Sequence, residues 1–159
     1  MSAAPPQETA VHGTALLIGE TGVLLRGASG AGKSLLALDL IERTRGCGGF
    51  AALIGDDRVL LSAAHGRIVA RPHPAIAGRI ELRGAGIARL AEAAWEPAGV
   101  IRLVVDLLEA AEIARDRHPE EAGGRVFLCG AALPRLRLCG EAPAATGAIL
   151  AYIHRLVVF

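Results

Sequence analysis

The chain contains a single lysine, Lys33, and this residue completes the pattern G-x-x-x-x-G-K-[ST]. A compact ammonium can enter between phosphate oxygens inside a tight loop of backbone amides, whereas a planar guanidinium is too large for that place. The pattern therefore predicts a phosphate-binding loop in which Ser34 supplies a hydroxyl to Mg²⁺. The residues of this loop are Gly27, Ala28, Ser29, Gly30, Ala31, Gly32, Lys33 and Ser34.

The segments on either side of the loop fit this role. Residues 21–26 predict a short apolar strand that enters the loop, and residues 34–43 predict a helix that leaves it. In this order, the loop amides and the positive end of the helix dipole face the same phosphates. A glycine-rich turn could match the pattern by chance in a chain with 20 glycines, but the match also uses the only lysine. We therefore expect nucleotide binding.

Two adjacent carboxylates, Asp56 and Asp57, follow the apolar run 51–54. Ligands of α/β sheets collect at the carboxyl ends of strands, so both side chains are candidates for the site. One carboxylate could coordinate Mg²⁺ while the other accepts a proton from an incoming hydroxyl. The alternative interpretation is a solvent-exposed Asp-Asp turn.

Asp106 is a rival metal ligand, because it closes the apolar run 100–105 as a Walker B carboxylate does. Its use would indicate an ATPase or GTPase, and the other interpretation of Asp106 is an N-cap for the following helix.

Glu81 and Arg83 alternate on one face of a predicted strand. This pair suits metal binding beside phosphate neutralisation, and it equally suits an ordinary ion pair.

Length and composition indicate one α/β domain. At 159 residues the chain is long enough for one ordinary core. We expect residues 1–10 to form a flexible N-terminal tail and residues 11–159 a single P-loop domain. Strands are predicted at 14–18, 22–26, 51–54, 59–61, 67–70, 100–105, 125–129 and 135–138, and helices at 33–44, 85–94, 107–114 and 145–156.

Charge and hydropathy exclude several classes of protein. The formal net charge of +1 provides no general attraction to nucleic acid or an anionic membrane. No apolar run reaches the ~20 residues of a membrane span, and the first nine residues do not form a signal peptide, so we expect a cytoplasmic protein. The three cysteines show no C-x-x-C spacing and indicate neither disulfides nor a zinc site.

Four stretches, in their order along the chain, resemble the catalytic domain of HPr kinase/phosphorylase, the bacterial enzyme that phosphorylates a serine of the phosphocarrier protein HPr. They are His12-Gly13, the loop 27–34, Asp56-Asp57-Arg58-Val59 and the segment 80–87. The resemblance covers residues 11–87 well and the remainder loosely. It implies an α/β P-loop kinase fold of the HPr kinase and phosphoenolpyruvate carboxykinase-like type, with a mixed, curled β-sheet and flanking helices.

The resemblance also implies roles for single residues. His12 matches a histidine beside the acidic pair, and Asp57 matches the carboxylate that accepts a proton in phosphorylation and donates it in dephosphorylation. Arg117 resembles a mobile-loop arginine that contacts phosphate. The implied catalytic residues are His12, Lys33, Asp56, Asp57 and Arg117, the implied metal ligands are Ser34, Asp57 and Glu81, and Arg83 is expected to join the loop in binding nucleotide.

The implied reaction is transfer of phosphate from Mg²⁺-bound ATP to a serine of HPr, with the reverse phosphorolysis by the same site. The chain resembles the short form of the family, without the N-terminal domain of long members, and a homo-oligomer is an open possibility. The Gly-Arg-Asn element tied to dephosphorylation is missing from residues 136–143. Two other functions stay open: a Walker-type ATPase or GTPase switch that uses Asp106, and a nucleotide sensor or scaffold that transfers no phosphate.

Overall fold

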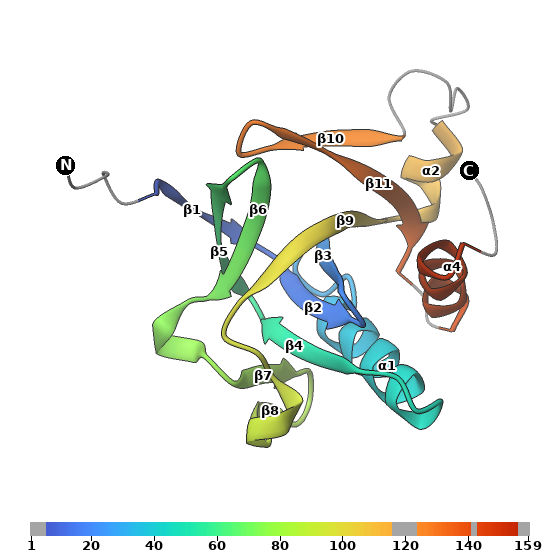
Figure 1. The fold of residues 1–159 in the computed structure, drawn as a ribbon. Helices are drawn as coiled ribbons and strands as arrows, with labels where there is room; N and C mark the ends of the chain where they lie inside the picture. Colours follow the sequence, from blue (N-terminus) through green and yellow to red (C-terminus); the bar gives the residue numbers. More distant parts are fainter. Residues whose placement is uncertain (1–5, 116–123, 141–142, 156–159) are drawn as a thin grey trace.

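The computed structural model describes residues 6–115, 124–140 and 143–155. Its main feature is a mixed sheet of nine strands in the order β1-β5-β6-β9-β3-β2-β4, with β11 paired to β9 and β10 to β11 (Figure 1). Strands β3, β9 and β11 run parallel, and the other neighbours are antiparallel. The strands are β1 (Glu8–His12), β2 (Thr14–Ile18), β3 (Thr21–Gly27), β4 (Ala51–Gly55), β5 (Arg58–Ala64), β6 (Arg67–Pro72), β9 (Gly99–Leu108), β10 (Arg125–Leu128) and β11 (Ala131–Cys139).

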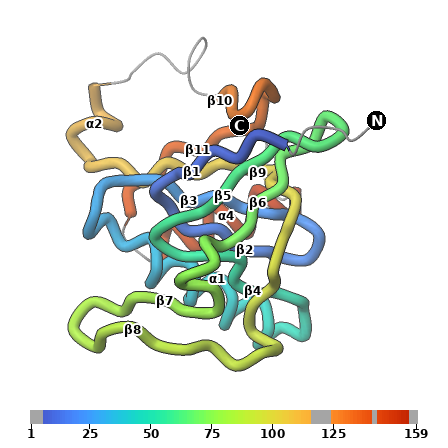
Figure 2. The backbone as a smooth tube through the Cα atoms, turned by 90° about the vertical axis from the view of Figure 1, so that its left-hand side faces the viewer, coloured from blue at the N-terminus to red at the C-terminus, as the bar shows by residue number. Residues whose placement is uncertain are grey.

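A separate hairpin of β7 (Arg79–Leu82) and β8 (Gly86–Arg89) lies at one end of the molecule (Figure 2). The described helices are α1 (Lys33–Gly46), α2 (Ala110–Arg115) and α4 (Ala144–Ile153), with short 3₁₀ turns η1 (Pro74–Ile76) and η2 (Glu92–Ala94). Within the described residues, none of the helices is long and apolar enough to cross a membrane.

The central strand β3 is apolar on both faces, because both faces are covered. Val23 and Leu25 pack into a core with α1 and α4, whereas Leu24 packs into a second core on the opposite face. All three side chains are fully buried. A strand buried on both faces reads as a continuous apolar run, which is why residues 22–26 were predictable as a strand.

Helix α1 packs one apolar stripe against the sheet and starts without a side-chain cap. Leu36, Leu40 and Ile41 are buried in the core shared with α4. The N-cap residue is Gly32, in the left-handed region at φ 91°, and no side chain bonds to the first turn. The free N–H groups of that turn therefore remain available to a ligand.

Two of the sequence predictions were wrong. The segment 85–94, expected to be a helix, contains β8 and the 3₁₀ turn η2. Gly84 and Gly86 adopt φ values of 85° and 88°, which close the β7–β8 hairpin and override the helical composition. The expected tail over residues 1–10 also fails in part, because Glu8–His12 forms β1 and pairs with β5 along its whole length.

A smaller correction concerns the junction after Asp106. The predicted helix 107–114 begins later, because β9 continues to Leu108 and α2 starts at Ala110. The extra strand residues pair with β11, whose Leu138 and Cys139 lie opposite Leu107 and Leu108. The sheet pairing of β9 therefore prevails over the local helical pattern.

Candidate active site

The glycine loop holds Lys33 at the base of a pocket. The Lys33 ammonium donates to the carbonyl oxygens of Gly27 and Ala28, both at 2.9 Å, and its side chain is almost buried. Burial lowers the pKa of Lys33 below the ordinary value of 10.5, although Asp56 and Asp57 act in the opposite direction. Both acceptors are neutral carbonyls, so the charge of the ammonium is not consumed by an ion pair and is available to phosphate oxygens.

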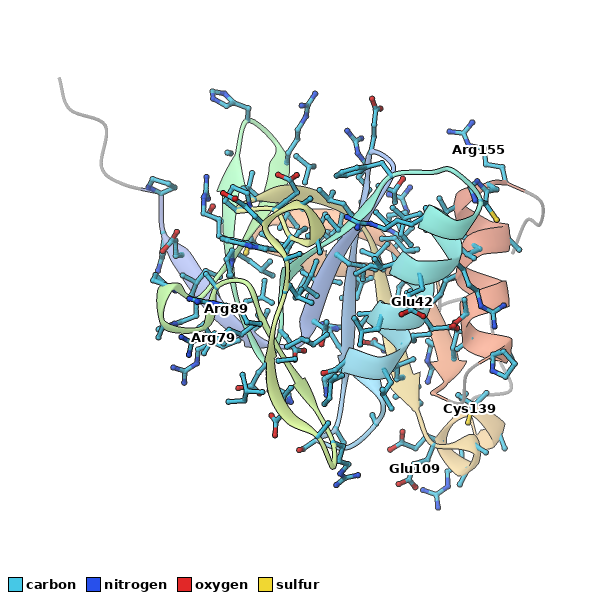
Figure 3. The ribbon with its side chains drawn as sticks, turned by 90° about the horizontal axis from the view of Figure 1, so that it is seen from below. Glu42, Arg79, Arg89, Glu109, Cys139 and Arg155 are labelled. Atoms are coloured by element: carbon cyan, nitrogen blue, oxygen red, sulfur yellow. The ribbon has the colours of Figure 1, made fainter. Side chains whose placement is uncertain are left out.

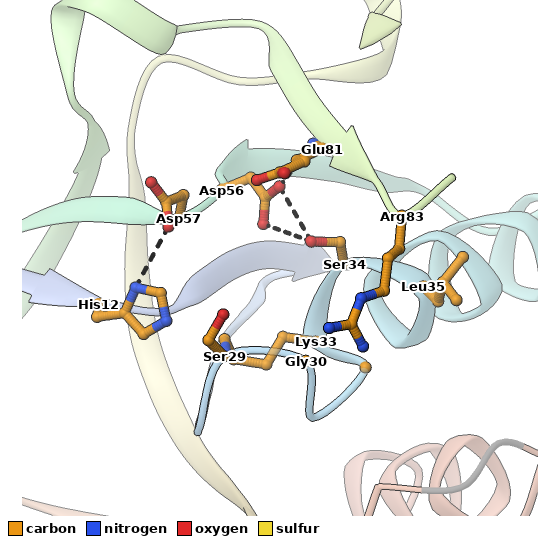
Figure 4. Close-up of a pocket in the computed structure, with 11 residues that line it drawn as sticks. His12, Ser29, Gly30, Lys33, Ser34, Leu35, Asp56, Asp57, Glu81 and Arg83 are labelled. Carbon is orange, nitrogen blue, oxygen red and sulfur yellow. Dashed lines mark hydrogen bonds and ion pairs between the residues drawn. The ribbon is translucent and has the colours of Figure 1, made fainter. Parts of the chain in front are cut away.

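The backbone of the loop needs its glycines. Gly30 lies at φ 81° and Gly32 at φ 91°, values that L side chains rarely adopt. A Cβ atom on Gly30 would lie 2.9 Å from a guanidinium nitrogen of Arg83. Arg83 therefore lies directly over the loop and adds a second cation to Lys33, as Figure 4 shows.

Asp56 is buried and surrounded by hydrogen-bond donors. It accepts from the Thr14 hydroxyl at 2.7 Å, from the Ser34 hydroxyl at 2.9 and 3.0 Å, and from the backbone N–H of Glu81 at 2.9 Å. Its exposed fraction is only 4%. These contacts join β2, the start of α1 and β7 at one carboxylate, which therefore has a fixed orientation.

Asp57 has a very different environment, although it is the next residue. Its backbone adopts φ 65°, in the left-handed region that aspartate tolerates better than most side chains. This turn points its carboxylate away from Asp56 and toward His12, whose Nδ1 lies 3.3 Å from Oδ1. Both side chains are more than half exposed. Asp57 is therefore accessible to a large second substrate.

These residues line one pocket of about 350 Å³ (Figure 4). The pocket brings together nearly all of the predicted site: the loop, the acidic pair, the histidine and both residues of the Glu81–Arg83 segment. Its lining residues are His12, Ser29, Gly30, Gly32, Lys33, Ser34, Leu35, Asp56, Asp57, Glu81 and Arg83. The predicted Arg117 lies outside the described residues.

The donor set fits a nucleotide with Mg²⁺. The loop offers uncapped amides, Lys33 and Arg83 to phosphates, and Ser34, Asp56 and Glu81 offer hard oxygen ligands beside them. Among the described residues, no group of three or more histidine, cysteine or acidic side chains is arranged to hold a metal. Mg²⁺ keeps several waters and needs only one or two carboxylates when phosphates complete its shell, so this sparse set is sufficient.

Asp106 lies elsewhere and has other partners. Its carboxylate accepts from Arg26 at 2.7 and 2.9 Å and from Arg135 at 2.5 Å, and it does not line the pocket. Burial alone would raise the pKa of Asp106, but the hydrogen bonds and charges of the two arginines lower it below 3.8. Asp106 lies inside β9 and is therefore not an N-cap, and its position outside the pocket argues against a Walker B role. Its contacts with Arg26 of β3 and Arg135 of β11 join these three strands.

Sequence reasoning missed two parts of this arrangement. Thr14 carries no motif, and only the pairing of β2 with β4 brings it to Asp56. The sequence analysis expected the two carboxylates to have different tasks and the resemblance made Asp57 the proton acceptor, but neither indicated that the Ser34 hydroxyl would contact Asp56. The assignment of Asp57 as a metal ligand remains a prediction, and the geometry adds Asp56 as the carboxylate nearest to the Ser34 hydroxyl.

Comparisons with known proteins found relatives that share one name. Curated relatives include the HPr kinase/phosphorylase of Mycoplasma mycoides, 43% identical over 76 residues that cover 48% of this chain and 22% of the relative. The HPr kinase/phosphorylase of Neisseria meningitidis is 36% identical over 104 residues, covering 62% of this chain and 31% of the relative. The chain thus spans less than a third of the length of these two relatives.

A solved structure confirms the expected fold. The Hpr(Ser) kinase/phosphatase from Coxiella burnetii matches with a TM-score of 0.73 at 22% identity, over 93% of this chain and 97% of that one. The family model described as HPr Serine kinase C-terminal domain matches residues 4–138, which is most of the chain. The chain therefore belongs to the HPr serine kinase C-terminal domain family.

Proposed function

We propose that the chain is an ATP-dependent protein-serine kinase that phosphorylates the phosphocarrier protein HPr. The names of the curated relatives and of the solved neighbour support this substrate. The observation that carries the proposal is the pair of adjacent carboxylates in unlike environments: Asp56 is buried among donors, and Asp57 is exposed beside His12. A kinase needs one carboxylate beside its metal and another that faces the acceptor hydroxyl.

In this proposal Asp57 is the general base. It accepts the proton of the serine hydroxyl as the new bond from serine oxygen to phosphorus forms and the bond from phosphorus to ADP breaks. His12, 3.3 Å from the Asp57 carboxylate, holds this side chain toward the acceptor. Lys33, Arg83 and the loop amides balance the negative charge of the transferred group.

Mg²⁺ belongs to the proposal as a cofactor. Ser34, Asp56 and Glu81 would hold it directly or through its waters, with Asp57 within reach in the same pocket. When bound, the ion supplies positive charge to the phosphates. The hydrogen bonds from Thr14 and Ser34 fix the orientation of the Asp56 carboxylate for that purpose.

The same site could run in reverse. Asp57, once protonated, can return its proton to the serine oxygen when inorganic phosphate attacks phosphoserine, which yields pyrophosphate and serine. The names of the relatives, which are phosphorylases, support this phosphorolysis, and the missing Gly-Arg-Asn element in residues 136–143 argues against it, so the reverse reaction is the weaker part of the proposal. The proposal also includes a cytoplasmic location, where ATP is available, and leaves the number of subunits to measurement.

The test is incubation of the chain with Mg²⁺-ATP and HPr from the same organism, followed by intact mass and phosphosite mapping. We expect one phosphate on an HPr serine, lost in Lys33→Ala and Asp57→Ala but retained in Asp106→Asn. ATP hydrolysis that ignores HPr and requires Asp106 would support the NTPase switch instead. Nucleotide binding without any turnover would support a sensor.

A further inference from the structure

The β7–β8 hairpin beside the pocket has two unlike faces. Along each strand alternate side chains point to opposite sides, and residues directly opposite in the ladder share a side. The inner face carries Ile80, Leu82 and Ala88, which pack against the core shared with α1. The outer face, defined here as Arg79, Glu81, Ile87 and Arg89, is exposed at every position.

Two arginines occupy directly opposite positions on this outer face. Arg79 pairs with Arg89 in the antiparallel ladder, and Figure 3 shows the two labelled residues close together at the margin of the molecule. Like charges placed opposite one another destabilise a hairpin. Among the described residues, neither arginine has a carboxylate within ion-pair distance. The two charges therefore do not stabilise the hairpin, and neither is neutralised by a carboxylate of the described residues.

An exposed apolar side chain completes the outer face. Ile87 is 69% exposed and lies opposite Glu81, which lines the nucleotide pocket. Interfaces often combine apolar anchors with arginine, and this face has one exposed isoleucine and two arginines. The surface thus begins at the edge of the active site and extends away from it.

A second cavity adjoins the proposed base. It has a volume of about 430 Å³ and shares His12 and Asp57 with the nucleotide pocket. Its other wall is basic, with Arg58 and His73, and it includes Ile76 of η1, three residues before Arg79. Residues 58–89 contain six arginines and one acid, so this segment carries a net +5 in a chain of net +1.

We propose that the outer face of the β7–β8 hairpin and this second cavity form the docking surface for the protein substrate. This inference rests on the proposed kinase function. The surface fits an acceptor whose serine is flanked by acidic side chains and one apolar side chain. The acidic groups bind the arginine pair, the apolar group packs on Ile87, and the serine enters through the second cavity and reaches Asp57 from the side opposite the loop.

A protein acceptor explains the location of this surface better than a nucleic acid does. The surface includes an exposed isoleucine beside the two arginines. A protein binds the phosphate backbone of a nucleic acid through cations and polar groups, and an apolar side chain such as Ile87 adds nothing to those contacts. The second cavity is lined by Asp57, so an acceptor hydroxyl placed there would lie beside the proposed base.

The experiment compares two double variants of equal charge. Arg79→Ala/Arg89→Ala removes the pair, and Arg102→Ala/Arg125→Ala removes two exposed arginines elsewhere, on β9 and β10. Initial rates are measured against HPr concentration at saturating Mg²⁺-ATP. We expect the KM for HPr to rise about tenfold or more in the first variant and less than twofold in the control, with kcat and the KM for ATP retained in both.

Two further measurements sharpen the test. The wild-type KM for HPr should rise with salt between about 50 and about 300 mM, and the Arg79→Ala/Arg89→Ala variant should lose most of this dependence. Ile87→Ser should raise the KM for HPr at every salt concentration. Thermal unfolding should show no loss of stability in the arginine variant, because a like-charge pair has been removed.

The outcomes separate the two proposals. If wild type phosphorylates HPr and the arginine variant has the KM of its control, the docking surface is overturned and the kinase function stands. The docking surface is overturned equally if both double variants raise KM to the same extent, or if Arg79→Ala/Arg89→Ala abolishes binding of a DNA duplex and leaves the KM for HPr unchanged. If wild type transfers nothing to HPr, both proposals fail.

Discussion

The Ser34 hydroxyl donates to the carboxylate of Asp56, at 2.9 Å from Oδ1 and 3.0 Å from Oδ2, and this contact assigns different tasks to two adjacent aspartates. Asp56 is tied to the first turn of α1 and is buried. Asp57 is turned outward by a positive φ and lies beside His12. One residue therefore belongs to the nucleotide side of the site, and its neighbour belongs to the acceptor side.

Substitution of each aspartate by asparagine should separate stability from catalysis. Asp56→Asn places an amide against three donors, which should lower the free energy of unfolding by about 2–3 kcal/mol. Asp57→Asn keeps a side chain that tolerates positive φ, so it should be nearly neutral for stability and slow phosphotransfer about 10²- to 10⁴-fold. Urea unfolding and HPr phosphorylation rates measure the two effects. Equal losses of stability in both variants would contradict the division of tasks.

Lys33 should make nucleotide affinity depend on alkaline pH. Burial lowers the pKa of the free Lys33 ammonium below 10.5, and bound phosphate favours the charged form. ATP binding should therefore take up a proton and weaken as the pH rises through the lowered pKa. Lys33→Met should bind at least about tenfold more weakly and show a flatter pH profile. Titration with a fluorescent ATP analogue between about pH 7 and about pH 10 measures this; a steep profile in Lys33→Met would assign the proton to another group.

Gly30→Ala should harm nucleotide binding for a reason beyond backbone strain. Its Cβ would lie 2.9 Å from Arg83, whereas Gly48 has nearly the same φ, 82° against 81°, and open space around it. Both variants should lose about 1 kcal/mol of stability from the positive φ. Only Gly30→Ala should also displace Arg83 and weaken ATP binding. Calorimetric titration measures the ATP affinity of both variants. Equal affinities would contradict the assignment of Arg83 to phosphate binding.

Asp106 should contribute to acid sensitivity and not to catalysis. Its pKa is below 3.8 in the folded protein, so its contribution to stability is present above pH 3.8 and is lost as the pH falls further, toward the folded pKa. Asp106→Asn leaves Arg26 and Arg135 without their anion and should cost about 3 kcal/mol at pH 7. Urea unfolding from about pH 7 to about pH 2 should show a weaker decline in this variant. Loss of phosphotransfer in folded Asp106→Asn would restore the Walker B interpretation.

Motifs whose chemistry depends on neighbours in the chain were predictable from the sequence. The loop 27–34 is of this kind, because consecutive backbone amides and one lysine create a phosphate site through local conformation. The apolar runs of β3 and β4 are also of this kind, since burial on both faces leaves a continuous signal. The resemblance of four ordered stretches then indicated the family, which the family model confirms.

Features that depend on long-range pairing were not predictable. The segment 85–94 has a helical composition, but two glycines with positive φ, Gly84 and Gly86, form a hairpin turn there instead. Residues Glu8–Ala10, expected in the tail, belong to β1 because they pair with the edge of β5. Asp106 follows the apolar run 100–105 within β9, and only the parallel pairing of β9 with β3 and β11 brings Arg26 and Arg135 to it. A short segment of sequence does not specify which other strand will pair with it in the sheet.

The sequence by itself determined that this chain has the phosphate-binding loop motif and that carboxylates follow the next strand, since both properties reside in short contiguous segments. Only the tertiary structure decided which carboxylate meets Ser34, which one faces His12, and that the β7–β8 hairpin turns two arginines outward beside the site. The physical reason is that hydrogen bonds and cross-strand contacts are made between segments far apart in the chain, where the register and twist of the sheet set the distances.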